Sequence, residues 1–210
     1  MIRKDIDSFI ASIPKDVTIV AATKYGDAND IKELVKHGIF NIGENRVDAF
    51  LTKYEELKES KDIKWHFIGH LQRNKAKLVA NKIDYLHSLD SLELAELLNK
   101  LRDKPLDTFI EVSINLEETK NGVPYYEVTS FIEKVKDYPN IHLVGLMMMA
   151  IKGSLDTNEQ FKKLRLLKEE IENKYKIKLP YLSMGMSDDY PDALKEGATH
   201  IRLGRILFDN

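Results

Sequence analysis

The stretch Val17-Thr-Ile-Val-Ala-Ala-Thr23 is a short run of β-branched and small apolar residues, and an amphipathic segment from Asp27 to His37 follows it. The run predicts a buried strand. The apolar residues of the second segment recur at helical spacing, and Gly38 stands where a helix would stop. One strand followed by one helix is therefore the unit from which we interpret the rest of the sequence.

The same unit returns along the whole chain. Seven further runs are predicted strands: 40–44, 65–71, 85–89, 108–114, 141–149, 181–183 and 200–203. An amphipathic stretch follows each strand but the last, and another helix is predicted near residues 2–13. An α/β fold, a single (β/α)8 TIM barrel with an N-terminal helix, is the economical prediction. A doubly wound open sheet is the alternative, because periodicity does not show whether the last strand pairs with the first.

Helix boundaries and domain limits follow from local signals. Asp90 with Glu93 three residues later resembles a capping box, and Pro191 opens a helix that Gly197 closes. No linker rich in Pro, Gly or Ser interrupts the alternation, so we expect one domain over residues 1–210.

Composition excludes several classes of protein. The 210 residues include 32 Lys and Arg against 34 Asp and Glu, and this net charge of −2 gives no basic field for nucleic acid. The longest apolar run, 143–151, is well below the roughly 20 residues of a membrane-spanning helix. With no cysteine there is neither a disulfide nor a cysteine metal site. We expect a cytoplasmic protein with no nucleic-acid or membrane partner.

Lys24 ends the first predicted strand, at the end of the barrel where function is expected. Its spacing of two from Ala22 and four from Val20 places all three side chains on one face, toward the barrel mouth. Apolar surroundings would lower the pKa of the amine and favour attack on a carbonyl, giving a Schiff base. The alternative is a lysine that merely extends its ammonium into solvent at a strand end.

Asn45, His66 and His70 are weaker signals. Asn45 follows the second strand and can hydrogen-bond a ligand, although asparagine there also suits a turn. His66 and His70 share a face of the predicted strand 65–71, but about 13 Å separates them, which is too far for one metal ion. We expect no metal. Either histidine can orient a ligand or bond to neighbouring backbone, and backbone bonding is the simpler interpretation for His70.

Two late segments are typical of phosphate binding. Leu182-Ser-Met-Gly-Met-Ser-Asp188 places hydroxyls around a glycine before a helix, and Arg202-Leu-Gly-Arg205 ends the last strand. Backbone N–H groups in such loops bind anions, and barrels commonly hold phosphate after strands seven and eight. With Lys24 they indicate a pocket for a phosphorylated carbonyl compound.

An ordered set of motifs gives a more specific indication. The motifs are Ala21-Ala-Thr-Lys24, Gly43-Glu-Asn-Arg46, His66-Phe-Ile-Gly-His-Leu-Gln-Arg-Asn-Lys75, Ser88-Leu-Asp90, Gly145-Leu-Met147, Ser183-Met-Gly-Met-Ser187 and Arg202-Leu-Gly204. In this order, from about Val17 to Phe208, the chain resembles the YggS/PROSC family of pyridoxal phosphate homeostasis proteins. The resemblance implies a barrel similar to the N-terminal domain of alanine racemase, holding pyridoxal 5′-phosphate (PLP).

The resemblance also implies roles for particular residues. Lys24 would hold PLP covalently as a Schiff base, and Arg202 would face the pyridine nitrogen. Ser187, Gly204 and the backbone of Arg205 would hold the phosphate. Arg205 stands where Thr or Ser is common and replaces a hydroxyl with a cation, which also suits a phosphate. The remaining implied neighbours of the cofactor are Asn45, His66 and Ser183.

A permanent cation at the pyridine nitrogen disfavours its protonation and weakens PLP as an electron sink. We therefore expect a protein for intracellular PLP homeostasis, with effects on amino-acid and keto-acid balance. We also expect it to be a monomer. It would buffer the cofactor or deliver it to PLP-dependent apoenzymes, with no catalytic residues. One alternative is an amino-acid racemase, with Lys24 on one face of Cα but no base assigned to the other. Another is an aldolase-type lysine acting on a sugar phosphate.

Overall fold

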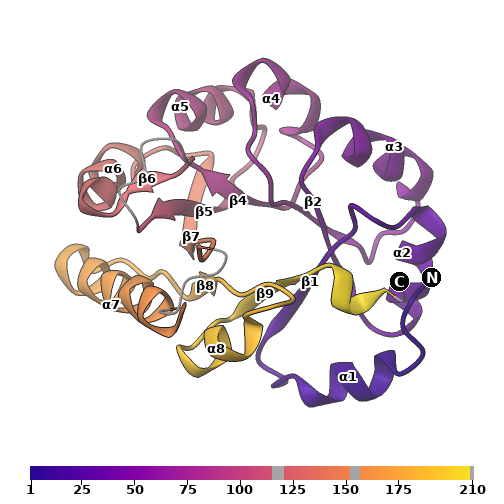
Figure 1. Cartoon of the computed structure of the whole chain (residues 1–210). Coiled ribbons are helices and arrows are strands. Elements are labelled where there is room, and N and C mark those ends of the chain that lie inside the picture. Colours follow the sequence, from indigo (N-terminus) through magenta and orange to yellow (C-terminus); the bar gives the residue numbers. More distant parts are fainter. Residues whose placement is uncertain (115–120, 152–156, 209–210) are drawn as a thin grey trace.

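The architecture is a closed barrel of parallel strands with helices around its outside (Figure 1). It is taken from a computed structural model that describes residues 1–114, 121–151 and 157–208. Among these residues the barrel order is β4-β3-β2-β1-β9-β8-β7-β5, and β4 also pairs with β5. That last pairing closes the sheet, so the (β/α)8 barrel is confirmed and the open sheet is wrong.

The barrel strands agree closely with the predicted runs. They are β1 (Thr18–Ala22), β2 (Asn41–Glu44), β3 (Lys64–Phe67), β4 (Tyr85–Leu89), β5 (Leu106–Ser113), β7 (Ile141–Met147), β8 (Tyr181–Ser183) and β9 (His200–Leu203). A two-residue strand that no pattern predicted, β6 (Val123–Pro124), pairs with the end of β5.

The helices lie between the strands, with α1 before β1. They are α1 (Ile6–Ser12), α2 (Ala28–Lys36), α3 (Val47–Leu57), α4 (Arg73–Val79), α5 (Leu92–Leu101), α6 (Val128–Val135), α7 (Thr157–Tyr175) and α8 (Tyr190–Lys195), with 3-10 turns at Tyr125–Glu127 and Arg205–Leu207. Among these described residues no helix is long and apolar enough to cross a membrane.

Two predicted strands end earlier than expected. β1 stops at Ala22, and a turn follows in which the N–H of Gly26 donates to the carbonyl of Thr23. β3 stops at Phe67, and at Gly69 the chain lies so close to Asn45 that an added Cβ would lie 2.2 Å from its carbonyl oxygen. His66 and His70 therefore do not share a strand face, and that expectation is wrong.

The predicted role of Asp90 as a helix cap is also wrong. The N-cap residue of α5 is Ser91, and no side chain caps that helix. The carboxylate of Asp90 instead accepts from the Ser91 hydroxyl and lies 2.8 Å from Nδ1 of His70. His70 was expected to bond to backbone, but this carboxylate is the partner of its Nδ1. The other signals were sound, since Pro191 lies in the first turn of α8 and Gly197 follows that helix with φ +81°.

The two faces of the sheet have different character. The outward face packs against the helices as one large apolar cluster. Inside the barrel, aromatic rings stack: His66 lies on Tyr85 with ring centres 4.4 Å apart, and His87 on Phe109 at 4.3 Å. Phe109 also belongs to a small apolar cluster with Val144 and Met147. Barrel interiors are usually filled by Val, Ile and Leu, so the two buried histidines are a departure that sequence periodicity did not reveal.

The two chain ends meet beside the seam between β1 and β9 (Figure 1). Ile2 forms an antiparallel bridge with Phe208, and the N–H of Arg3 donates to the carbonyl of Leu207. The Arg3 guanidinium adds a bond to the Ile206 carbonyl at 3.0 Å. The segment before α1 thus acts as a clasp on the residues that follow β9.

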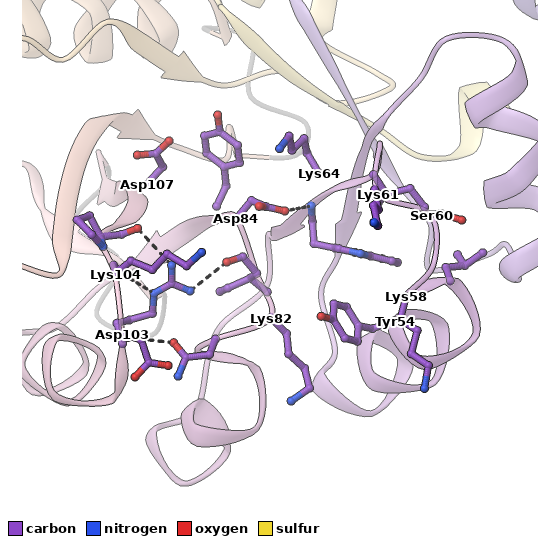
Figure 2. Close-up of a pocket in the computed structure, with 18 residues that line it drawn as sticks. Tyr54, Lys58, Ser60, Lys61, Lys64, Lys82, Asp84, Asp103, Lys104 and Asp107 are labelled. Atoms are coloured by element: carbon purple, nitrogen blue, oxygen red, sulfur yellow. Dashed lines mark hydrogen bonds between the residues drawn. The ribbon is translucent and has the colours of Figure 1, made fainter.

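A groove of about 500 Å³ opens where β3, β4 and β5 begin, at the opposite end of the barrel from Lys24 (Figure 2). One residue of its lining is Arg102, whose guanidinium donates to four backbone carbonyls of the surrounding loops: those of Ala80, Ile83, Lys104 and Pro105. Asp84 accepts from the N–H of Trp65 at 2.8 Å in the same region. These contacts tie the loops together, and the groove takes no part in the site described next.

Candidate functional site

Several predicted site residues, Lys24, Asn45, Ser187, Gly204 and Arg205, follow the ends of β1, β2, β8 and β9. We define this end of the barrel, where the strands finish, as the barrel mouth. β1 pairs with β2 on one side and with β9 on the other. Lys24 therefore follows a strand that adjoins both the strand before Asn45 and the strand before Gly204. A Cβ added at Gly204 would lie 3.7 Å from the Cβ of Ala22, which shows how closely these two strand ends approach.

Lys24 lies in the turn after β1 rather than at the strand end. Its side chain is exposed, and its ammonium nitrogen lies 4.5 Å from the centre of the Tyr25 ring. The apolar surroundings expected for this amine are absent, because the strand ends two residues earlier and the turn carries the lysine into solvent.

A buried ion pair anchors the turn that carries Lys24. The Lys53 ammonium, from α3, bonds to the Glu44 carboxylate and donates to the Thr23 carbonyl at 2.6 Å. The Thr23 hydroxyl donates to the same carboxylate oxygen of Glu44 at 2.6 Å. The other oxygen, Glu44 Oε2, is buried and has no hydrogen-bond partner among the described residues. Three elements are thus locked together one residue before Lys24.

Sequence reasoning missed Lys53 altogether. It lies in the apolar stripe of α3, three residues after Phe50 and four before Leu57, and all three side chains are buried. A lysine inside such a stripe is the signal that could have found it, because a buried ammonium needs a partner.

Ser187 is the centre of a group of converging backbone N–H groups. Its hydroxyl oxygen accepts from the N–H of Gly204 at 3.3 Å and from that of Ile206 at 3.5 Å. The N–H of Arg205 between them has no acceptor in the described part of the chain. Gly185, with φ +91°, turns the loop where a Cβ would lie 2.7 Å from Ala193. N–H groups arranged in this way suit a phosphate.

The Arg205 side chain is already engaged. Its Nη2 donates to both carboxylate oxygens of Asp188, at 2.7 and 2.8 Å, on the exposed rim of the mouth. The backbone of Arg205, and not its guanidinium, is therefore the group directed at the space beside Ser187.

Arg202 is a buried cation, with 4% of its surface exposed. It donates to the Ser183 hydroxyl at 2.6 Å and to the Met148 carbonyl at 2.9 Å. Burial lowers its pKa to about 10, while the charges of Glu111 and Asp189 oppose that shift. Arg202 consequently remains a cation at neutral pH.

His66 and Ser183 belong to a hydrogen-bonded interior network, which we define as Asn41, His66, His87 and Ser183. His66 Nε2 lies 3.0 Å from Asn41 Oδ1, and His66 Nδ1 lies 2.8 Å from His87 Nε2. His87 Nδ1 lies 2.8 Å from Ser183 Oγ. Both histidines are fully buried, and burial lowers the pKa of each well below its ordinary value.

Little in the local sequence pattern singles out Asn41 or His87. The useful signal was polar residues at every second position of predicted strands, since these face the barrel interior together. Asn45, in contrast, is exposed at the end of β2, and its contact with a ligand stays a prediction. In the described part of the chain no cluster of three or more His, Asp or Glu side chains could hold a metal ion.

Glu111 is a further buried acid at the mouth, with 4% of its surface exposed at the end of β5. Burial first, and then the charge of Asp90, raise its pKa from 4.5 to about 7, while Arg202 acts in the opposite direction. The carboxyl therefore titrates near neutral pH.

Comparison with known proteins places this geometry in a family. The family described as "Alanine racemase, N-terminal domain" matches residues 3–209. The pyridoxal phosphate homeostasis protein of Aquifex aeolicus is 40% identical over 195 residues, covering 90% of this chain and 85% of that protein. That of Synechocystis sp. is 37% identical over 205 residues, covering 95% and 94%. This chain belongs to the pyridoxal phosphate homeostasis protein family. The resemblance inferred from the motifs is confirmed.

Solved structures of the family have the same fold. PipY of Synechococcus elongatus without PLP has a TM-score of 0.94 at 31% identity, over all of both chains. PipY with PLP bound has a TM-score of 0.91 at 31% identity, over 97% of this chain and 100% of that one. The alanine racemase of Corynebacterium glutamicum shares only the fold, at 14% identity and a TM-score of 0.72, and this chain covers 57% of it.

The anchor of the Lys24 turn gives a first prediction. Lys53→Met leaves the Glu44 carboxylate buried without its cation, which should lower the free energy of unfolding by about 3–5 kcal/mol. The double variant Lys53→Met with Glu44→Gln removes that charge and should recover most of the loss. Urea denaturation measures both, and a loss under about 1 kcal/mol in the single variant would contradict this account of the pair.

Glu111 gives a prediction on pH. The folded protein keeps a proton that the unfolded chain releases above pH 4.5, so this group's contribution to stability falls as pH rises toward 7. Glu111→Gln should therefore be more stable than the parent at pH 8, by up to about 3 kcal/mol, and nearly equal to it at pH 4.5.

Denaturation at pH 4.5 and pH 8 measures this difference for Glu111→Gln and for a control, Glu93→Gln. Glu93 is exposed in the first turn of α5, so its substitution should change stability by less than about 0.5 kcal/mol at either pH. Equal behaviour of the two variants would show that the Glu111 carboxyl is not perturbed.

Proposed function

We propose that this protein binds PLP at the barrel mouth and serves intracellular homeostasis of the cofactor, with Lys24 as its covalent attachment point. One observation carries the proposal: Lys24, the cation Arg202 and the N–H groups around Ser187 come together from adjoining strands. Their chemistry suits the three functional groups of PLP in turn: the amine suits the aldehyde, the cation suits the pyridine nitrogen, and the N–H groups suit the phosphate. PipY with PLP bound, similar over nearly the whole chain, supports the same conclusion.

The residues fit the cofactor on structural grounds. The Arg205 N–H has no acceptor in the described part of the chain, so a phosphate oxygen would satisfy it without displacing an existing bond. The N–H groups of Gly204 and Ile206, with the Ser187 hydroxyl, would complete the anion site. Asn45, His66 and Ser183 remain proposed neighbours of the ring, with His66 and Ser183 already bonded within the interior network.

Each residue group would have a separate task. The Lys24 amine, exposed in a turn held rigid by Thr23, Glu44 and Lys53, supplies the nucleophile. Arg202 presents a permanent positive charge and accepts no proton, so it disfavours protonation of a pyridine nitrogen beside it. PLP supplies an electron sink for carbanion chemistry when bound, and such an arginine weakens that property. The arrangement therefore favours holding the cofactor over turning over amino acids.

Covalent attachment is tested on the purified protein. After loading with PLP the protein should absorb visible light, and borohydride reduction with peptide mass spectrometry should place the adduct on Lys24. Lys24→Ala should lose the adduct and stay folded, whereas Lys32→Ala, an exposed lysine on α2, should keep it. A colourless protein that cannot be loaded with PLP would overturn the proposal.

Delivery is tested by transfer. Loaded protein mixed with an apoenzyme that requires PLP should activate it even when a phosphatase destroys PLP released into solution. Activation abolished by the phosphatase would indicate a buffer that only releases the cofactor. Solvent deuterium entering Cα of amino acids at enzyme-like rates would instead support a racemase. We propose that the protein acts as a cytoplasmic monomer with PLP-dependent apoenzymes as its partners.

A further inference from the structure

Arg202 is held without a carboxylate. Both hydrogen bonds of its guanidinium go to neutral oxygens, Ser183 Oγ and the Met148 carbonyl, and no acid of the described residues lies within ion-pair distance. A buried cation in such a position is costly unless oriented dipoles replace the water it has lost. The charges of Glu111 and Asp189 act on Arg202 only from beyond ion-pair distance. The neutral groups that bond to it must therefore be arranged in a definite direction.

The donor properties of arginine fix the first step of that direction. A guanidinium only donates, so Ser183 Oγ is the acceptor of the Arg202 bond. The hydroxyl retains one proton, and its other partner among the described residues is His87 Nδ1 at 2.8 Å. The proton must point to that nitrogen, and His87 Nδ1 is consequently the unprotonated nitrogen of its ring.

The same reasoning continues through the barrel. A neutral His87 carries its proton on Nε2 and donates it to His66 Nδ1. His66 then carries its own proton on Nε2 and donates it to Asn41 Oδ1. Every donor meets an acceptor at 2.6 to 3.0 Å, and no group in the series has to be charged except Arg202.

We propose that the interior network is a set of positioning residues for Arg202, in which His87 and His66 hold the Ser183 hydroxyl turned away from the guanidinium so that its oxygen can only accept. Each member presents its acceptor side toward Arg202, and the aligned dipoles stabilise the cation where a carboxylate would neutralise it. Arg202 thus keeps both its full charge and a fixed place at the mouth. The proposal rests on the proposed function only in taking the group facing Arg202 to be PLP.

The first test uses the protein without PLP, so that it stands apart from cofactor binding. Histidine side-chain ¹⁵N NMR should show His66 and His87 neutral from pH 6 to 8, each protonated on Nε2. Their N–H protons and those of Arg202 should exchange slowly with water. A charged imidazole, or a proton on Nδ1 of either histidine, would overturn the proposal.

The second test separates positioning from packing. His87→Phe removes the acceptor for the Ser183 hydroxyl and should weaken PLP binding about tenfold, the factor corresponding to one net hydrogen bond. It should also speed solvent exchange of the Arg202 protons. His87→Asn, whose amide oxygen lies near the place of Nδ1, should restore most of both.

The matched control is His200→Phe. His200 is also buried in the barrel, 6.2 Å from the His87 ring, but its Nδ1 pairs with Thr199 Oγ1 outside the interior network. This variant should bind PLP and protect Arg202 as the parent does. Equal losses in His87→Phe, His87→Asn and His200→Phe would show a packing role and overturn the proposal. If His87→Phe does not fold, the comparison of His87→Asn with Ser183→Ala decides, because only the asparagine keeps the Arg202 protons protected.

Failure of the proposed function gives a different result. In that case the parent and His200→Phe would not bind PLP, while the NMR of the free protein would still show both histidines protonated on Nε2.

Discussion

The pairing of β1 with β9 is the constraint on which the rest of the structure depends. In this register Val20 lies opposite Arg202 and Ala21 opposite Leu203, and the seam joins the first strand of the barrel to the last. It brings the Lys24 turn next to the loop of Gly204 and directs Arg202 into the interior. A shift of one residue would turn Arg202 outward against the helices, because successive side chains of a strand face opposite sides. The clasp of Ile2 and Arg3 beside Phe208 reinforces this seam.

The sequence was sufficient for the architecture and for the general place of the site. Strand boundaries at Tyr85–Leu89 and Tyr181–Ser183 were predicted to the residue, because alternation of apolar strands and amphipathic helices is a local property. Strand ends were less predictable where another segment decides them. β3 is followed by the close approach of Gly69 to Asn45, and β1 by a turn in which Gly26 bonds to Thr23. Such contacts join residues far apart in the sequence or depend on a turn geometry that apolar patterns do not encode.

The residue types of the candidate site could be predicted from the sequence, but the residues that bond to them and hold them in place could not. Lys24 and Ser187 follow β1 and β8, and Arg202 lies near the end of β9. A barrel concentrates its chemistry at this end, so their positions and residue types pointed to a phosphorylated carbonyl compound. The residues that hold them were hidden. Lys53 lies within a helical apolar stripe. His87 lies inside β4, and the sequence pattern assigned a role only to the polar residue after that strand, Asp90. Asp90 was assigned to a helix cap because its spacing fits one, yet the carboxylate pairs with His70 from the neighbouring loop.

The seam also has a consequence for how the protein is made. Lys24 leaves the ribosome early, and the backbone N–H groups of Gly204 and Arg205, which form the proposed anion site, leave it much later. β1 can pair with its second neighbour only when β9 has been synthesised. Closing the barrel therefore brings together strands that are far apart in the sequence, which is a slow kind of folding step. A nascent chain would therefore carry the Lys24 amine before the N–H groups that we propose to bind phosphate. The proposed site would be complete only once β9 has paired with β1.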